Sequence, residues 1–590
     1  MARLYKLTNN IHDNLTNYIP ATIADYPSKF VHLQRIKSAT MNIFCVNTGQ
    51  YVEVRGGETL LEISRRIPLG FEPIAARVNN KNEALCFEVF HSRMVEYLPV
   101  THPSGERTYI RSLCMVLYRA VTRVAPEARL SVEHSISRGY YCRLGEGVEC
   151  TPELVARIEA EMRSIVERDC PLERREELTA DAIRIFEAQG LTDKVELLRT
   201  SHQLYTTYYR LDGICDSYYG TLAPSTGILR VWELRPFKEG FLLVGFDREE
   251  PSRTATHIDQ EKMYRAFTEY VRFNRIVGVR NVGELNETVL RHRTADLINV
   301  SEALHEKALA RISDEITARY RAGGARIVLI SGPSSSGKTT TTKRLGIQLM
   351  TNLLKPQLIS LDDYFVDRER TPRDASGDYD YESLYALDLA QFNADLKAIL
   401  RGEEVQLPTY NFETGTRQYK GRSIRLGDDS ILLIEGIHGL NPELTDAIPE
   451  EMKYRLYVSS LTTITIDDHN WIPTTDNRLL RRIIRDHKYR GTSATETIRR
   501  WPSVRRGEER WIFPYQENAD ATFNSSLLYE LSVMKEIAEP ILRDVPRDAV
   551  EYSEAYRLRK FLSYFLPVDL RLIPSTSLLR EFLGGSSFKY

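Results

Sequence analysis

One short segment constrains this chain of 590 residues more than any other feature. It reads Gly332-Pro333-Ser334-Ser335-Ser336-Gly337-Lys338-Thr339, and Thr340 follows. The β-branched run RIVLIS precedes it, and the apolar-periodic segment TTTKRLGIQLM comes after it. A GxxxxGK[ST] pattern between a strand and a helix predicts a phosphate-binding loop. Its glycines let backbone N–H groups surround a phosphate at the positive end of the helix.

The polar side chains of the loop have distinct expected parts. Lys338 can reach the β- and γ-phosphates of a nucleotide, and the Thr339 hydroxyl can ligate Mg²⁺. We expect residues 332–340 together to form the site for ATP or GTP. The preceding strand is suited to a buried parallel sheet. The motif alone leaves open whether the domain is a switch, a motor or a kinase.

Two adjacent aspartates supply the next clue. QLISLDDYF reads as a second strand that ends at Asp362 and Asp363. In a doubly wound sheet the carboxyl ends of the strands line the ligand crevice. A carboxylate there can accept a proton from an attacking hydroxyl, although a capping or turn role is the alternative for Asp362. We expect the side chain of Asp363 to point away from that of Asp362.

Residues 326–530 resemble the uridine kinase and phosphoribulokinase family of P-loop kinases. SGPSSSGKTT matches the phosphate loop of that family, SLDDYF matches the segment with its catalytic aspartate, and ILLIEGIHGL matches the strand with its metal-associated acid. The resemblance implies that Asp362 and Lys338 are catalytic. It also implies that Thr339 and Glu435 hold Mg²⁺.

The same resemblance covers the substrate side. DYDYESLYALDL is similar to the stretch that holds ribose hydroxyls, here through Asp380. LPTYNFETGTR is similar to the base-binding segment and places three side chains near a nucleoside: Tyr410, Phe412 and Arg417. The two aromatic residues could instead be core residues. Pyrimidine-specific members carry a histidine where this chain has Gly415, so the resemblance leaves the nucleobase undecided.

An arginine-rich segment completes the resemblance. DNRLLRRIIRDHKYRG is similar to the lid of these kinases, with four arginines in register: Arg478, Arg481, Arg485 and Arg490. The first three share one helix face. Because like charges on one face repel, phosphate is their expected counterion.

The N-terminal half has a different character. Two strand-like runs, MNIFCV and YVEVRG, precede a segment in which Thr59 and Glu62 have capping-box spacing. This pattern predicts a β-grasp domain. GGETLLEISRRIPLGFEPIAARVNNKNEAL resembles the TGS domain of threonyl-tRNA synthetases. The chain to about Phe246 resembles their second additional domain, the editing domain in bacteria, through VEHSISRGYYCRL and GICDSYYGTLAPSTG.

The editing residues themselves are replaced. Two histidines four apart, and a Cys/His pair four apart, would converge on one site in the editing domain. Those positions hold Arg111, Met115, Tyr218 and Leu222. Neither metal ligation nor acid–base chemistry is expected from this set. A binding or scaffold role is the better interpretation of this region.

The expected fold is a multidomain chain of α+β and α/β type with a doubly wound parallel sheet in its kinase-like part. The predicted divisions are an arm (1–40), a TGS-like β-grasp domain (41–100), an α+β editing-like domain with a connector helix (101–300), a P-loop uridine kinase-like domain (301–545), and C-terminal helices with a tail (546–590). Because Gly323-Gly324 ends the connector helix, we expect the kinase-like domain to fold on its own from near residue 300.

Composition bears on the partners of the chain and on the compartment in which it works. The formal net charge is -2, so no global field draws the chain to nucleic acid or membrane. No apolar run approaches the ~18–20 residues that span a bilayer, and no secretory signal is recognisable. The 7 cysteines contain no CxxC pair, which favours free thiols in the cytoplasm. Homo-oligomerisation stays open.

The sequence therefore predicts a kinase that uses Mg²⁺ and ATP (or GTP) to phosphorylate the 5′-hydroxyl of a nucleoside, either uridine and cytidine or a broader set. One alternative is a P-loop kinase of another small-molecule alcohol. The other is an RNA- or ribosome-associated regulator that depends on a nucleotide and contacts tRNA through its N-terminal half.

Overall fold

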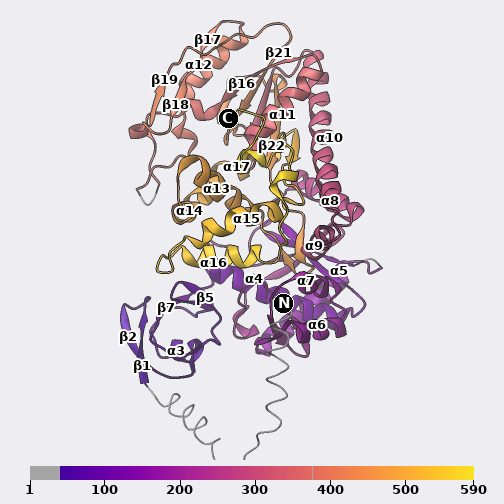
Figure 1. The fold of residues 1–590 in the computed structure, drawn as a ribbon, viewed down its shortest axis with the longest axis vertical. Helices are drawn as coiled ribbons and strands as arrows, with labels where there is room; N and C mark the ends of the chain where they lie inside the picture. Colours follow the sequence, from indigo (N-terminus) through magenta and orange to yellow (C-terminus); the bar gives the residue numbers. More distant parts are fainter. Residues whose placement is uncertain (1–39, 146, 375–376, 590) are drawn as a thin grey trace, which may run out of the picture.

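The computed structural model describes residues 40–145, 147–374 and 377–589, so the predicted arm lies outside the described residues except for Thr40. Figure 1 shows a parallel sheet at one end of the molecule and the N-terminal sheets at the other. A layer of C-terminal helices lies between them. Within the described ranges, no helix is long and apolar enough to cross a lipid bilayer.

The N-terminal unit is a five-stranded mixed sheet of order β2-β1-β7-β4-β5. Its strands are β1 (Thr40–Cys45), β2 (Gln50–Arg55), β4 (Ala75–Val78), β5 (Lys81–Glu83) and β7 (Met94–Leu98). The β1–β2 pair is antiparallel, whereas β1 and β7 are parallel. The capping box is confirmed: Glu62 N–H donates to Thr59 Oγ1 at 3.2 Å, and Thr59 N–H donates to Glu62 Oε2 at 2.8 Å, at the start of α3 (Leu60–Ser64).

The middle unit surrounds the long helix α4 (Pro103–Val124). One sheet has the order β13-β14-β9-β8 and another β10-β11-β12. Their strands are β8 (Leu130–Ile136), β9 (Gly139–Leu144), β10 (Glu173–Leu178), β11 (Tyr205–Leu211), β12 (Ile214–Asp216), β13 (Glu233–Phe237) and β14 (Gly240–Val244). The helices are α5 (Pro152–Glu167), α6 (Thr179–Ala188) and α7 (Thr192–Thr200).

The positions that replace the editing residues lie in the core of this unit. Met115, Tyr218 and Leu222 belong to one buried apolar cluster. Arg111 is also buried, and its guanidinium stacks 4.6 Å from the centroid of the Tyr219 ring. These side chains support packing, because burial of apolar groups is what stabilises such a cluster.

Three helices lead into the C-terminal unit: α8 (Glu261–Val277), α9 (Val282–Leu290) and α10 (Thr294–Arg321). The last is the predicted connector helix. A five-stranded sheet of order β16-β21-β15-β22-β25 follows, and all its strand pairs are parallel. The strands are β15 (Ile327–Ser331), β16 (Lys355–Ser360), β21 (Ser430–Glu435), β22 (Lys453–Ser459) and β25 (Ala521–Asn524).

Helices cover both faces of this sheet. α10 and α11 (Lys338–Thr351) pack on one face, because Leu309, Ile316 and Leu345 share a buried cluster with strand residues there. α12 (Leu389–Leu400) packs on the other face through Phe392 and Leu396. Two layers of helices around a parallel sheet form a doubly wound α/β domain, as the sequence predicted.

The remaining helices begin with the lid segment and lie between the sheet and the N-terminal units (Figure 1). They are α13 (Thr474–Arg490), α14 (Ala494–Trp511), α15 (Glu530–Arg543), α16 (Tyr552–Leu562) and the short α17 (Arg580–Leu583). Two further hairpins are formed by β18 (Thr409–Asn411) with β19 (Thr416–Gln418), and by β23 (Thr465–Asp467) with β24 (Asn470–Trp471).

The β23–β24 hairpin inserts into the middle unit. Lys194 Nζ lies 2.8 Å from Asp216 of its own unit and 2.8 Å from Asp467 of the hairpin. His469 Nδ1 lies 2.7 Å from the second carboxylate oxygen of Asp216. Val132 N–H donates to the carbonyl of Asp468 at 2.7 Å. All of these side-chain charges are buried, so the two units share a polar interior.

An apolar cluster also crosses this junction. Leu197, Val282 and Leu297 pack with hairpin and lid residues such as Ile466 and Leu480. The expectation that the C-terminal part folds on its own from residue 300 finds no support in this packing. A fragment cut there would expose the hairpin and this cluster to water.

Replacing Lys194 with methionine tests the junction. The variant keeps the volume of the side chain but leaves the buried Asp216 and Asp467 carboxylates without their cation. We expect the free energy of unfolding to fall by about 3–5 kcal/mol. Chemical denaturation of the full chain measures it, with the exposed Lys307→Met as the control, which should change stability by less than about 0.5 kcal/mol. Equal stability of the two variants would refute the role of the junction.

Candidate functional site

The phosphate-binding loop connects β15 to α11 at the carboxyl edge of the parallel sheet. Gly337 has a φ of 85°, a left-handed conformation that glycine adopts without strain, immediately before the helix begins. Lys338 folds back over the loop and donates from Nζ to the Pro333 carbonyl at 3.1 Å. The predicted loop residues are therefore brought together at the N-terminus of α11.

Two carboxylates stand at the ends of neighbouring strands. Glu435 ends β21 and pairs in register with Ser360, the last residue of β16. Its Oε1 accepts hydrogen bonds from Ser360 Oγ at 3.2 Å and from Thr339 Oγ1 at 3.4 Å. Asp362 lies just beyond β16, in a short turn that spans Leu361–Tyr364. The sheet thus places both acids beside the phosphate loop.

The two adjacent aspartates face different neighbours. Asp363 accepts a hydrogen bond from Tyr410 N–H at 3.4 Å, on the side of the β18–β19 hairpin. Asp362 is exposed to solvent at the mouth of the site, where the positive charges of Lys338, Arg490 and Arg485 act on it. A carboxylate that must meet a substrate hydroxyl requires such access.

The electrostatics of the site are dominated by packed carboxylates. Burial, followed by the charge of Asp362, raises the pKa of Glu435 to about 7. Burial lowers the pKa of Lys338, and four acids oppose that shift: Glu435, Asp362, Glu581 and Glu382. Burial also raises the pKa of Glu382 to about 7, and the charge of Arg482 acts in the opposite direction.

The donor set fits Mg²⁺. Thr339 and Glu435 offer a hydroxyl and a carboxylate on adjoining elements, and oxygen ligands are those that Mg²⁺ prefers. In the part of the chain that the structure describes, no three His, Cys, Asp or Glu side chains form a complete metal cage. Mg²⁺ sites commonly use one or two carboxylates and complete their shell with substrate phosphates and water.

Two of the four lid arginines are held by glutamates. Arg478 and Arg481 are 1% and 0% exposed. Arg478 pairs with Glu508 of α14 and donates from Nε to the Ser334 carbonyl at 2.9 Å. Arg481 donates from Nε to Glu530 at 3.1 Å and from a terminal nitrogen to the Ser525 carbonyl at 2.9 Å. Their counterions are carboxylates of this chain, and they join α13 to the phosphate loop.

Three further arginines of α13 reach the site. Arg485 and Arg490 both act on Asp362, and Asp486 lies between them, 2.8 Å from Arg485 and 3.4 Å from Arg490. Arg482 donates to Ser334 Oγ at 2.8 Å and acts on Glu382. Arg482 was not among the predicted lid residues, although its place beside Arg481 in the matched lid segment could have suggested it.

No sequence motif predicted four glutamates of the site: Glu382, Glu508, Glu530 and Glu581. Glu382 follows Asp380 by two residues, and Asp380 Oδ1 accepts from Glu382 N–H at 3.2 Å. Glu508 also accepts from Ser334 N–H at 3.0 Å. The others lie far along the chain from the loop, so only the fold brings them to it.

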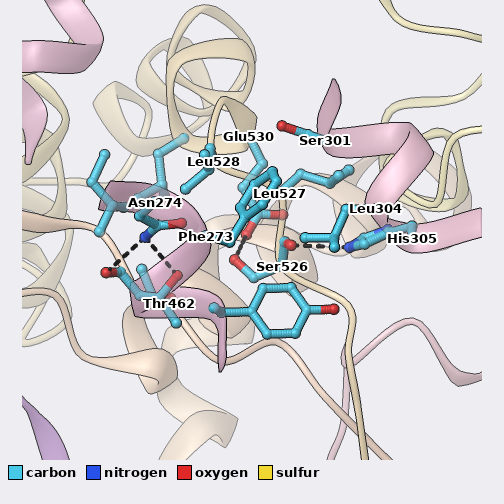
Figure 2. Close-up of a pocket in the computed structure, with 14 residues that line it drawn as sticks. Phe273, Asn274, Ser301, Leu304, His305, Thr462, Ser526, Leu527, Leu528 and Glu530 are labelled. Atoms are coloured by element: carbon cyan, nitrogen blue, oxygen red, sulfur yellow. Dashed lines mark hydrogen bonds between the residues drawn. The ribbon is translucent and has the colours of Figure 1, made fainter. Parts of the chain in front are cut away.

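A small pocket lies among residues of α8 and α10 and the start of α15, and Glu530 is part of its lining (Figure 2). His305 Nε2 lies 3.1 Å from the Ser526 carbonyl, and Asn274 donates to the Thr463 carbonyl at 3.1 Å. Burial lowers the pKa of His305 to about 3, so this histidine is neutral. The cavity of about 10 Å³ is smaller than any substrate. The residues around the cavity include members of α8, α10 and the Glu530 end of α15.

The predicted nucleoside-binding residues lie on or near the β18–β19 hairpin. Tyr410 is buried, with its ring 5.5 Å from Phe365 and 5.0 Å from Phe412. Phe412 is 55% exposed. Tyr410 Oη is buried and has no hydrogen-bond partner among the described residues. Arg417 pairs with Asp388 at 2.9 Å, at the N-terminus of α12.

The backbone explains Gly415. Its φ is 71°, and a Cβ atom there would lie 2.8 Å from Cβ of Arg368. Arg368 N–H also donates to the Gly415 carbonyl at 2.9 Å. The position turns the hairpin and packs against Arg368, so a histidine would be strained and without room here.

A parallel sheet, a phosphate loop at its carboxyl edge and an arginine lid define the class of P-loop kinases. Comparison of the sequence with family models agrees with this class. Residues 327–529 match the model of the Phosphoribulokinase / Uridine kinase family, so this segment is a domain of that family. The resemblance predicted from the sequence is confirmed for it.

The N-terminal half is similar to other proteins. The threonine–tRNA ligase of Desulforamulus reducens is 31% identical over 189 residues, which are 32% of this chain and 30% of the ligase. That of Carboxydothermus hydrogenoformans is 29% identical over 179 residues, 30% of this chain and 28% of the ligase. The chain thus spans about a third or less of the length of these relatives.

Two solved structures were also found similar. A possible uridine kinase from Bacillus stearothermophilus is 20% identical, with a TM-score of 0.23, over 34% of this chain and 89% of that one. The D-glycerate 3-kinase from Cryptococcus neoformans is 15% identical, with a TM-score of 0.20, over 44% of this chain and 87% of that one.

Proposed function

We propose that the C-terminal domain transfers the γ-phosphate of ATP or GTP to the 5′-hydroxyl of a nucleoside. The observation that carries this proposal is the position of Asp362, open to solvent at the end of β16 and facing Lys338 of the phosphate loop. Phosphoryl transfer needs positioning and charge neutralisation more than covalent chemistry, and these groups supply both.

Each group has a part in the proposed reaction. Asp362 accepts the proton of the attacking hydroxyl and orients its oxygen toward the γ-phosphorus. Lys338 and the N–H groups of residues 335–340 bind the phosphates, and Arg482, Arg485 and Arg490 neutralise the charge that develops on the transferred group. Mg²⁺ held by Thr339 and Glu435 would supply further neutralisation of the β- and γ-phosphates.

The acceptor is proposed from the hairpin. Phe412 offers an exposed aromatic face for a base, and Tyr410 Oη offers an unused hydrogen-bonding group. Asp380, close to Glu382 at the same edge, is the proposed partner of the ribose hydroxyls. Arg417 is engaged by Asp388, so its proposed contact with the nucleoside requires sharing of that ion pair.

The N-terminal half supports a second proposal. Its similarity to threonine–tRNA ligases favours a TGS-like domain near residues 41–100 and an editing-like domain near 101–300, which would contact tRNA or another RNA. The domain limits from the sequence stay part of this proposal. Retention on immobilised tRNA with a steep salt dependence would support it, because each phosphate contact releases counterions.

Asp362→Asn tests the catalytic assignment. The change keeps the shape of the side chain and removes its charge, so ATP binding should stay nearly unchanged. We expect kcat to fall by roughly 10²–10⁴, the usual size of a general-base contribution. Product formation with Mg·ATP and a panel of nucleosides, followed by mass spectrometry, measures it.

Asp363→Asn is the matched control, because Asp363 faces Tyr410 and not the phosphate loop. Its kcat should change much less. A larger fall in kcat for Asp363→Asn than for Asp362→Asn would assign the catalytic role to Asp363. The proposed substrate-binding residues would then be wrong as well. Full activity of both variants would refute the kinase proposal.

Nucleoside selectivity tests the hairpin. Gly415 presents no side chain to a base, so the site should accept purine as well as pyrimidine nucleosides. We expect kcat/KM values for uridine, cytidine, adenosine and guanosine to lie within about 100-fold, or about 2.7 kcal/mol, of one another. A larger and exclusive preference for the two pyrimidines would contradict this account. Activity only on sugars or other alcohols would instead replace the nucleoside as acceptor.

A further inference from the structure

A glutamate from the end of the chain lies at the start of helix α11. Thr340 N–H donates to Glu581 Oε2 at 3.1 Å, and Thr340 Oγ1 donates to the same oxygen at 2.6 Å. Thr340 belongs to the first turn of α11, directly after Lys338 and Thr339. N–H groups at such a helix end are the donors that bind phosphate in loops of this kind. A protein carboxylate therefore holds phosphate-binding donors.

The segment that carries Glu581 is firmly attached. Four apolar side chains around it are buried: Leu578, Leu579, Phe582 and Leu583. Leu578 packs directly on the loop, since a Cβ atom at Gly337 would lie 2.6 Å from its Cδ2. Lys488 of the lid helix donates to the Leu583 carbonyl at 2.6 Å. Such burial keeps the backbone of residues 578–583 docked, so any movement has to come from the Glu581 side chain.

Charge makes Glu581 a rival of phosphate. Its carboxylate acts on Lys338 and on Glu435, which are the groups proposed to meet the phosphates and Mg²⁺. A nucleotide phosphate would need the donors of Thr340 that Glu581 holds, and it would bring negative charge next to the carboxylate. Because both cannot occupy the same donors, binding of one requires the other to leave.

We infer that Glu581 is an intramolecular competitor for the nucleotide phosphates and so sets the nucleotide affinity of the site. This inference rests on the proposed function. In the resting protein Glu581 satisfies the N-terminus of α11, and an incoming nucleotide displaces only this side chain while the apolar residues beside it stay packed. The residue controls affinity without touching the reacting atoms, so it is a positioning residue and not a catalytic one.

Glu581→Gln separates the charge from the shape. The amide oxygen can still accept from Thr340, but it no longer repels phosphate. We expect the Kd for ATP to fall at least tenfold, both with Mg²⁺ and with EDTA, in calorimetric titrations of the full chain. The KM for ATP should fall as well, while kcat does not rise. Glu536→Gln, which removes an exposed charge on α15, should leave all of these values unchanged.

Several outcomes would overturn the inference. Equal or weaker ATP binding by Glu581→Gln would show that the carboxylate does not compete. Weaker binding with Mg²⁺ alone, and unchanged binding with EDTA, would make Glu581 a metal ligand instead. A lower unfolding temperature without tighter binding would mean a purely structural cap.

ATP binding by the wild-type protein separates a failure of the proposed function from a failure of this inference. If wild type and Glu581→Gln both bind no ATP, the nucleotide site itself is wrong and this inference falls with it. If wild type binds ATP and forms a phosphorylated nucleoside, while Glu581→Gln has the same Kd, only the inference about Glu581 fails. Lys338→Ala should weaken ATP binding in either background, because Lys338 contacts phosphate directly under the proposed function.

Discussion

Two buried arginine–glutamate pairs hold the catalytic half of this protein together. Arg478 with Glu508, and Arg481 with Glu530, join the lid helix α13 to α14 and α15. The same guanidinium groups contact carbonyls of the phosphate loop, among them that of Ser334. Removal of one partner from a buried pair typically lowers the free energy of unfolding by about 3–5 kcal/mol, because the remaining charge stays buried without a counterion. The lid and the loop therefore form one unit.

This arrangement divides the work of the lid. Arg478 and Arg481 are structural, whereas Arg482, Arg485 and Arg490 act on the loop, Asp362 and Glu382. A lid docked in advance places these cations before the nucleotide arrives, so little reorganisation is needed when charge develops. Among the carboxylates near Lys338, Asp362 and Glu382 are partly balanced by these arginines. Bound Mg²⁺ would balance Glu435.

Much of this was visible in the sequence, because its signals are local. The phosphate loop lies between a β-branched run and a periodic helix. Glu435 ends one strand and Asp362 lies just beyond another, where parallel strands expose their carboxyl ends. The capping box at Thr59 and Glu62 is complete within four residues. The amphipathic periodicity of the connector helix, and the glycine pair that ends it, predicted this helix.

The rest depends on contacts between distant parts of the chain. A helical face of arginines predicts acidic or phosphate counterions, but the sequence cannot say that Glu508 and Glu530 supply them. Nor does it show that Glu581 returns to the loop from the end of the chain, since a single glutamate in a tail has no pattern. The insertion of residues 465–471 into the middle unit is equally hidden, because Lys194 and Asp467 lie far apart in the sequence.

The middle unit is thus built into the same body as the kinase-family domain. Buried charges at the β23–β24 hairpin and a shared apolar cluster connect them, and α13 packs against that cluster through Leu479, Leu480 and Ile483. Arg111, Met115, Tyr218 and Leu222 contribute to this body as packing residues.

Hydrogen exchange of α13 tests the central claim most directly, namely that protein carboxylates dock the lid on the phosphate loop without nucleotide. The account predicts that amides of residues 478–484 are strongly protected in the free protein, and that Mg·ATP adds little protection there. Rapid exchange of this segment in the free protein, with protection appearing only when Mg·ATP is added, would contradict it. In that case phosphate and not glutamate would be the counterion that closes the lid.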